Sequence, residues 1–425
     1  MELGIPLAIE RRRLANGLRV VVHEDPALPL VAVNLWYHVG SKNERPGRTG
    51  FAHLFEHMLF QGSKHVGTND HFRHLQSVGG VANGSTWYDR TNYYETVPAH
   101  QLDLALWLES DRMGYLLPAL DQKKLDTQRD VVMNERRQRV DNQPYGRPYE
   151  RLFELLFPPG HPYHWPVIGT MEDIAAATLE DVRAFFGTYY VPRNAVLTLA
   201  GDIRAEDAFD RVERWFGDLP GGKEPPPVRL DFEPLDGRVA ETIEDEVQLP
   251  RVYLAFRVPP YGERDWYAAS LLSTLLADGK SSPLYDDLVY RRQIAQDASC
   301  YVYPTEAAGV FVAAATAKPG IEPQAVADAL WSHLARAGDE SSLTEHLERT
   351  RNTTIAALCG QLETLDHRAD LLSMFTTLWD RPEAAWTEPD RYLEIAPEEM
   401  AALARGSLGR ERAVELTVVP REVAS

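Results

Sequence analysis

The sequence predicts an α+β fold of two homologous domains, each a mostly antiparallel sheet with helices packed on one face. The chain has 425 residues, which is more than a single hydrophobic core usually organises. A segment rich in proline and glycine lies at its middle, and the apolar patterns on its two sides resemble each other. Each half begins with β-type alternation, followed by helical periodicity and further strands. That order is typical of α+β domains.

The proline- and glycine-rich segment marks the boundary between the predicted domains. Asp218–Pro227 contains four prolines and two glycines, a composition that continues neither a helix nor a central strand. We therefore expect a first domain over 1–217, a linker over 218–237 and a second domain over 238–425.

The two halves carry similar patterns at nearly the same offset. Duplication of one unit explains the match, and the alternative is two unrelated domains that share periodicity by chance. The corresponding segments are Leu30–Tyr37 and Val252–Val258, Phe51–Leu59 and Ala268–Leu276, and Ala195–Leu199 and Ala413–Thr417.

The order of elements in the first half follows from its periodicity. The strand Arg19–His23 leads through a turn at Glu24–Pro26 to the strand Leu30–Tyr37. Helices are expected where apolar residues recur every three or four positions. These segments are Phe51–Phe60, His100–Met113, Lys123–Val140, Thr178–Tyr189 and Ala205–Phe216.

The charge balance argues against nucleic acid as a partner. The chain has 44 Lys and Arg against 63 Asp and Glu, a formal net charge of −19, whereas nucleic-acid binders carry a basic surface. This charge fits solubility, or an acidic chamber that favours basic ligands. Only two cysteines are present, Cys300 and Cys359, which is too few for a disulfide framework.

Targeting signals are not visible in the sequence. No stretch approaches 18 consecutive apolar residues, so no membrane span is expected. The first ten residues lack the basic and apolar regions of a secretory signal, which makes the cytoplasm the expected location. A periplasmic location stays open if a signal has been removed.

One short motif is typical of metal chemistry. His53, Glu56 and His57 form the pattern His-x-x-Glu-His inside the first predicted helix. Histidines four residues apart share a helix face, with Cβ atoms about 5–6 Å apart, and can bind one zinc ion. Glu56 lies on the same side, where it can act as a general base toward water. The alternative is a pair of surface histidines, but the apolar residues around them predict a mostly buried helix.

A third ligand is needed for a catalytic zinc, and Glu135 is the best candidate. Val131, Val132 and Glu135 share one face of the predicted helix over 123–140. A carboxylate on such an apolar face is costly unless its charge is neutralised, as a metal would do. The spacing leaves open an alternative, an exposed Glu135 paired with Arg139 four residues later.

These residues belong to a longer match. Pro46–Ser63, which contains His-x-x-Glu-His, closely resembles the zinc-site segment of the pitrilysin/insulinase family, whose members are inverzincins. The resemblance is best to half-size bacterial members that are similar to mitochondrial processing peptidase. It continues through segments in both halves, namely 79–86, 89–94, 130–138, 142–146 and 279–285.

The resemblance implies a zinc-dependent endopeptidase that cuts peptides or unfolded polypeptide segments. By this resemblance His53, His57 and Glu135 are the ligands of one Zn²⁺ per chain, and Glu56 is the base. Many members carry a glutamate seven positions before the third ligand. Gln128 stands there in this chain, and its amide can hydrogen-bond a ligand without adding negative charge.

The resemblance also suggests how substrate binds. Asn83 would lie on an edge strand to which the substrate adds as a further β-strand, and the alternative is a turn residue before Gly84. Active members often place an Arg, and a Tyr seven residues later, in the second domain. The matching positions here are Val289 and Gln296, so both members of the pair are missing.

Length and the missing pair together imply a partner. Larger relatives fuse two such chains into a closing clamshell, and this chain has the size of one half. We therefore expect a heterodimer with a zinc-less homologous subunit that supplies the Arg/Tyr pair, or else a homodimer. The alternative function is a non-catalytic assembly or core subunit of a larger complex. Such relatives typically lose the base or a ligand, whereas all four positions are kept here.

Other histidines are expected to have no role at the metal. His71 and His74 are placed on an exposed helix beside the site. His161 and His164 have a spacing that favours packing within a loop.

Overall fold

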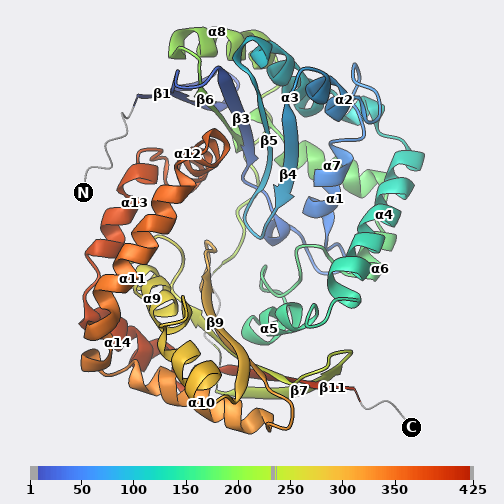
Figure 1. The fold of residues 1–425 in the computed structure, drawn as a ribbon. Helices are drawn as coiled ribbons and strands as arrows, with labels where there is room; N and C mark the ends of the chain where they lie inside the picture. The colour runs from blue at the N-terminus through green and yellow to red at the C-terminus, as the bar shows by residue number, and fades with distance from the viewer. Residues whose placement is uncertain (1–7, 231–234, 236, 422–425) are drawn as a thin grey trace. The chain divides into compact units, whose positions relative to one another are not determined.

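The computed structural model describes residues 8–230, 235 and 237–421 and divides into two compact units (Figure 1). The first unit combines the described residues up to Arg136 with 165–228 and 359–388. The second combines 137–164, the described part of 229–358, and 389–421. No helix among the described residues is long and apolar enough to cross a membrane.

A six-stranded sheet forms the centre of the first unit. Its strands are β1 (Ile9–Arg13), β2 (Arg19–Glu24), β3 (Leu30–Tyr37), β4 (Val81–Thr86), β5 (Thr91–Pro98) and β6 (Ala195–Gly201). The order is β1-β2-β6-β3-β5-β4, and every neighbouring pair is antiparallel except the parallel pair β2 and β6. Strand β4 is therefore an edge strand.

Helices cover both faces of this sheet. Val31, Val33 and Leu35 of β3 join the main core with residues of the helices on one face. Ala32, between them on the opposite face, packs against Ala369 of the long helix over 365–379. The helices of this unit are α1 (Phe51–Met58), α2 (Asp70–Ser77), α3 (Leu102–Tyr115), α4 (Gln122–Arg136), α6 (Met171–Ala175), α7 (Leu179–Tyr189), α8 (Ala205–Phe216) and α12 (Leu365–Trp379).

The second unit repeats this topology with a five-stranded sheet. Its strands are β7 (Val239–Asp245), β8 (Arg251–Val258), β9 (Ala295–Tyr303), β10 (Gly309–Ala317) and β11 (Val414–Pro420). The order β7-β11-β8-β10-β9 matches β2-β6-β3-β5-β4, with one parallel pair at the same place. The predicted fold class of two homologous α+β domains is therefore confirmed.

The second sheet also carries helices on both faces. Tyr149 contacts Tyr253 of β8 with ring centroids 5.9 Å apart, whereas Trp331 contacts Phe256 at 5.8 Å. Three positions separate Tyr253 from Phe256, so the two contacts lie on opposite faces. The helices of this unit are α5 (Pro148–Leu156), α9 (Arg264–Ala277), α10 (Pro323–Arg336) and α14 (Pro397–Ser407). Helices α11 (Glu340–Gln361) and α13 (Ala384–Leu393) have residues in both units.

Two helices pack on the sheet of the other half of the sequence. Helix α12 comes from the second half and covers the first sheet, and α5 comes from the first half and covers the second sheet. This exchange adds a helix on the second face of each sheet, besides the helices that the sequence predicted on one face. The boundaries 1–217, 218–237 and 238–425 stay a prediction, and the compact units differ from them by these two segments.

The predicted helices of the first half correspond to α1, α3, α4, α7 and α8. The helix predicted over 123–140 is not α-helical throughout. Helix α4 ends at Arg136, and the chain continues as the π-helical segment η4 (Arg137–Asp141). A second π-helical segment is η6 (Tyr285–Arg291), and short 3-10 helices lie at Ser41–Asn43 (η1), Ala99–Gln101 (η2), Leu117–Ala119 (η3), Pro192–Asn194 (η5) and Arg410–Arg412 (η7).

Ionisable side chains lie inside the core where α2, α3 and β5 meet. His71, Glu95, Glu109 and Arg112 are each at most 2% exposed, so the expectation of an exposed His71 was wrong. Arg112 pairs with both carboxylate oxygens of Glu109, and its guanidinium lies 4.1 Å from the centre of the Tyr93 ring. Neither oxygen of Glu95 accepts a hydrogen bond from the described residues.

Charge balance in this cluster requires a bound proton. Burial raises the pKa of Glu95 well above its ordinary value, and the nearby Glu109 raises it further. Burial lowers the pKa of His71, which keeps its imidazole neutral. A protonated Glu95 therefore leaves one carboxylate, that of Glu109, for the single guanidinium of Arg112.

We predict that Glu95 makes stability depend on pH. Because its pKa is raised in the folded state, the free energy of unfolding falls as pH rises above the unfolded value of about 4.3, by at most about 1.4 kcal/mol per pH unit. Glu95→Gln keeps the shape without the ionisation, so its unfolding midpoint in denaturant should exceed that of the parent most at pH 8 and least at pH 5. The exposed Glu206→Gln on α8 is the control. A Glu95→Gln difference that does not change with pH would contradict the assignment.

The packing of α12 supplies a second prediction. Ala369 is fully buried against Ala32 and Ala200, so a larger side chain has no room there. Ala369→Leu should lower the free energy of unfolding by about 1–3 kcal/mol. Ala357→Leu makes the same change at an exposed position of α11 and should have little effect. Equal denaturation midpoints for the two variants would show that α12 is not packed as described.

Candidate metal centre

Helix α1 presents the motif residues along one side. Its apolar side chains, among them Leu54, Phe55 and Met58, are buried in the core of the first unit. His53, Glu56 and His57 are only partly buried and lie on the other side. The alternative of two exposed surface histidines does not hold, because the side chains of His53 and His57 are only 12% and 22% exposed.

The start of α1 is fixed by a buried carboxylate. Glu44 accepts hydrogen bonds from the backbone N–H groups of Gly50 and Ala52, each at 2.8 Å. Burial raises the pKa of Glu44, and these backbone hydrogen bonds oppose the rise. Gly50 has a φ of 83°, and a Cβ there would lie 2.6 Å from the carbonyl oxygen of Ile168. Only glycine can therefore adopt the backbone conformation found at position 50, directly before α1. Glu44 accepts hydrogen bonds from backbone N–H groups at the start of the helix, which have no partner within the helix itself.

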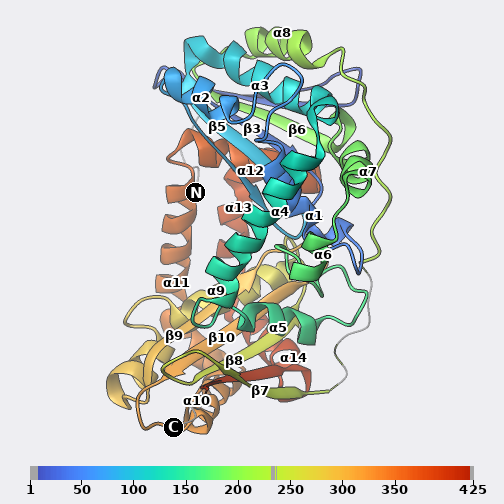
Figure 2. The same cartoon turned by 90° about the vertical axis from the view of Figure 1, so that its right-hand side faces the viewer.

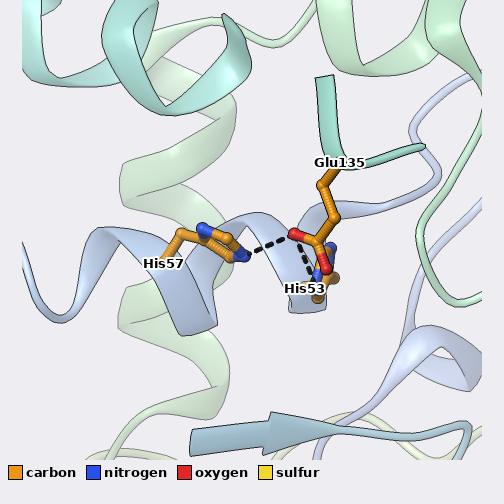
Figure 3. Close-up of side chains that lie close together, drawn as sticks. All are labelled: His53, His57 and Glu135. Atoms are coloured by element: carbon orange, nitrogen blue, oxygen red, sulfur yellow. Dashed lines mark ion pairs between the residues drawn. The ribbon is translucent and has the colours of Figure 1, made fainter. Parts of the chain in front are cut away.

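The third predicted ligand meets the two histidines. Helix α4 runs beside α1 and brings Glu135 to it (Figures 1 and 2). Glu135 Oε2 lies 3.2 Å from His57 Nε2 and 3.8 Å from His53 Nε2 (Figure 3). One possible ligand atom from each of the three residues lies within 4.8 Å of the other two.

The donor set fits a zinc ion. Two imidazoles and one carboxylate form a known ligand set of catalytic zinc, which keeps a fourth position open. With bonds of roughly 2.0–2.1 Å, ligand atoms of a tetrahedral site lie about 3.3 Å apart. The two Oε2–Nε2 distances, 3.2 and 3.8 Å, lie close to this spacing. A small adjustment of the side chains would complete the site.

Glu56 lies beside the three residues but is held separately. Thr86 Oγ1 on β4 donates a hydrogen bond of 2.7 Å to Glu56 Oε2. A Cβ added to Gly84 would lie 3.1 Å from Glu56 Cγ, so the lack of a side chain there makes room for the carboxylate. Burial raises the pKa of Glu56, and the Thr86 hydrogen bond and the charges of His57 and Arg90 oppose this rise.

The two remaining predicted residues occupy distinct places. Asn83 is exposed on the edge strand β4, so the alternative of a turn residue was wrong, and its role toward substrate stays a prediction. Its Oδ1 accepts a hydrogen bond from the backbone N–H of Gly84. Gln128 is 5% exposed on α4, seven residues before Glu135 and hence on the same helix face.

Sequence reasoning missed the residues that hold the motif in place. Glu44, Thr86 and Arg90 act on α1 from a preceding loop, from β4 and from the turn after β4. Glu44 is identified only by its hydrogen bonds with the backbone N–H groups of Gly50 and Ala52 at the start of α1. No helix N-cap pattern in the sequence marks a residue six positions before the N-cap residue, which is Gly50. Thr86 is identified only by the packing of β4 against α1.

A second set of donors has similar spacing. His71, Glu95 and Glu109 also bring ligand atoms within 4.8 Å of one another. Arg112 already supplies a positive charge to this set, and a proton on Glu95 balances the other carboxylate. We therefore assign no metal to these three residues. His161 packs within its loop as predicted: its Nδ1 accepts the Tyr163 N–H, and burial lowers its pKa to about 4.

Comparison with protein families gives two matches that together span most of the chain. Residues 19–156 match the model described as Insulinase (Peptidase family M16). Residues 176–354 match the model described as Peptidase M16 inactive domain. The first match contains His53, Glu56, His57 and Glu135. The second covers most of the second unit.

Known proteins resemble the chain along nearly its whole length. A zinc protease named PqqE from Helicobacter pylori is 32% identical over 364 residues, covering 85% of this chain and 81% of that protein. A crystal structure of a protease from Helicobacter pylori superposes with a TM-score of 0.92 at 28% identity, covering 98% of this chain and all of that one. The periplasmic protease PqqL from Escherichia coli shares the fold at a TM-score of 0.79 and 19% identity, and the match covers 48% of its chain. These similarities, with the His-x-x-Glu-His helix and the duplicated α+β unit, show that the chain belongs to the pitrilysin/insulinase family, peptidase family M16.

Proposed function

We propose that the protein is a zinc-dependent endopeptidase that cuts peptides or unfolded polypeptide segments. One observation carries the proposal: His53, His57 and Glu135, from two helices, bring their ligand atoms together beside the partly buried carboxylate of Glu56. A relative 32% identical is named a zinc protease, which agrees with it. His53, His57 and Glu135 would hold one Zn²⁺ per chain.

The chemistry follows from where each residue stands. Zinc bound there would polarise the scissile carbonyl and lower the pKa of a water molecule. Glu56 takes a proton from the attacking water at its carboxylate and passes it to the leaving amine. Thr86 holds the Glu56 carboxylate in orientation through its 2.7 Å hydrogen bond. The free edge of β4 can bind the substrate backbone as an added strand, with Asn83 beside it.

Among the described residues of the second unit, no His, Cys, Asp and Glu side chains form a possible metal-binding group of this kind. In the repeat, Ser270 and Thr274 of α9 take the places of His53 and His57. The description of the matched second family model as inactive agrees with this difference. A non-catalytic role for the whole chain is the alternative function. The kept base and ligands on α1 and α4 favour the peptidase.

We further propose that the active enzyme contains two chains. This chain covers 48% of PqqL, and the positions where active relatives place the Arg/Tyr pair hold Val289 and Gln296. A zinc-less homologous subunit that supplies the pair would complete the site, and a homodimer is the second possibility. A cytoplasmic location stays a prediction from the sequence.

Replacing the base and a ligand should separate catalysis from metal binding. Glu56→Gln is expected to retain about one zinc per chain while losing at least about 10²-fold of peptide cleavage, because a general base contributes that much or more. Glu135→Gln should lose zinc as well as cleavage. The exposed His100→Gln should keep both. Zinc content by mass spectrometry and hydrolysis of a quenched peptide measure the two effects, and an active Glu56→Gln would refute the mechanism.

Purification from the native host should recover the chain as a complex. We expect a second, similar-length chain that lacks His-x-x-Glu-His and carries the Arg/Tyr pair, measured by light scattering and mass spectrometry of the tagged protein. Mixing the two purified chains should raise kcat/KM well above that of either alone. A fully active monomer would contradict both the heterodimer and the homodimer.

A further inference from the structure

Two buried amide side chains lie on the α12 face of the first sheet. Asn34 of β3 and Asn92 of β5 are only 1% and 2% exposed. Asn34 lies two positions after Ala32, which packs against α12, so it points to the same face. A buried amide is costly unless its donors and acceptors are paired. The hydrogen-bond partners of these amides therefore show what they hold in place.

Asp370 of α12 is the acceptor on which these side chains converge. Its Oδ1 accepts the Nε1–H group of Trp36 at 2.7 Å and the Nδ2–H groups of Asn92 at 2.9 Å and Asn34 at 3.3 Å. Helix α12 packs on β3 and β6, and Ala369, next to Asp370, is fully buried there. Asp370 is therefore a fixed acceptor, and it fixes the side chain of Asn92.

Asn92 connects Asp370 to the edge strand β4. Ser85 of β4 lies opposite Asn92 in the sheet, and its Oγ donates a hydrogen bond of 2.6 Å to Asn92 Oδ1. From the turn after β4, Arg90 Nη1 donates to the carbonyl oxygen of Ser85 at 2.9 Å and to its Oγ at 2.6 Å. Ser85 is thus held through both its backbone and its side chain. The name β4 network is used below for Asn34, Trp36, Ser85, Arg90, Asn92 and Asp370.

Strand β4 depends on this network because little else holds it. Only β5 pairs with it, and its other edge is free. Val81 and Asn83 are exposed, and Gly84 in the middle of the strand has no side chain to pack. A strand with few buried contacts opens locally more readily than a central strand. The β4 network therefore supplies order that apolar packing does not.

Order in β4 affects the binding of a substrate that adds to it as a strand. If β4 is already extended and fixed, the peptide loses only its own freedom on binding, whereas a frayed β4 would have to be ordered at the same time. Once the peptide is bound, β4 is ordered in both cases. The candidate ligands and Glu56 lie on α1 and α4, outside the network. The network therefore acts on substrate binding rather than on the chemical step.

We propose that Asp370, Asn92 and Ser85 are positioning residues, which keep β4 ordered so that it can receive the substrate backbone. The inference rests on the proposed function and adds residues that lie outside the metal centre. Asp370 comes from the second half of the sequence, so the substrate strand of the first half depends on helix α12.

The hydroxyl of Ser85 gives the first test. A fluorescent, unstructured peptide is titrated into the full-length, zinc-loaded Glu56→Gln protein, which binds without cutting. We expect Ser85→Ala in this protein to weaken binding about tenfold, since it loses a hydrogen bond from a charged group. Ser85→Thr keeps the hydroxyl and should bind within about threefold of the Glu56→Gln protein. Ser77→Ala on α2 also removes a hydroxyl that donates a hydrogen bond, and it should leave binding unchanged.

An exchange of two side chains tests the connection to α12. Asn92→Asp brings a second carboxylate against Asp370 and should weaken peptide binding at least about tenfold, because like charges repel. Adding Asp370→Asn restores an amide and a carboxylate as neighbours with their positions exchanged. The double variant should therefore bind within about threefold of the protein that has neither change.

Two further measurements separate positioning from a general loss of folding. With Glu56 intact, Ser85→Ala should raise KM about tenfold and change kcat less than about threefold, whereas a loss of folded molecules lowers kcat at constant KM. Without peptide, amide exchange over 81–86, followed by mass spectrometry, should be about tenfold faster in Ser85→Ala. Exchange over α2 should stay the same.

Failure of this inference can be told apart from failure of the peptidase. Unchanged peptide binding in both Ser85→Ala and Asn92→Asp would overturn the positioning role and leave cleavage by the parent chain intact. A loss of binding that neither Ser85→Thr nor the exchanged pair restores would overturn it as well. Binding that is weakened and then restored as described, in a chain that binds zinc but cuts no peptide, would support the positioning role and refute the peptidase.

Discussion

The candidate centre depends on how helix α1 is held. Its apolar side is buried in the core of the first unit, and Glu44 fixes its first turn through two backbone hydrogen bonds. A helix fixed in rotation and at its start can present His53 and His57 toward only one place, which is where α4 brings Glu135. The geometry of the candidate metal centre is thus a consequence of ordinary core packing and of one buried carboxylate.

The duplicated architecture explains how each sheet is covered on both faces. Each sheet is covered on its second face by a helix from the other half of the sequence, α12 on the first and α5 on the second. In the first unit, α1 carries the candidate ligands His53 and His57 on one face of the sheet, and α12 covers the other face.

Much of this could be predicted from the sequence because the signals are local. The structure contains a helix with both His53 and His57, helices where the apolar periodicity predicts them, and two sheets of the same strand order where the apolar runs repeat. Long-range packing could not be predicted: the exchange of α5 and α12, the burial of His71 and the hydrogen bond from Thr86 to Glu56 all join residues that no local pattern links. Glu135 falls between these cases. Its helix was predictable, but the choice between ligand and exposed residue depended on α4 lying beside α1.

We propose that His53, His57 and Glu135 bind a single zinc ion beside Glu56. The most direct test is a crystal structure of the zinc-loaded Glu56→Gln protein, with diffraction collected on both sides of the zinc absorption edge. We expect one anomalous peak per chain, about 2.0–2.2 Å from His53 Nε2, His57 Nε2 and a carboxylate oxygen of Glu135. An empty site at saturating zinc, or a peak bound by other residues, would contradict it.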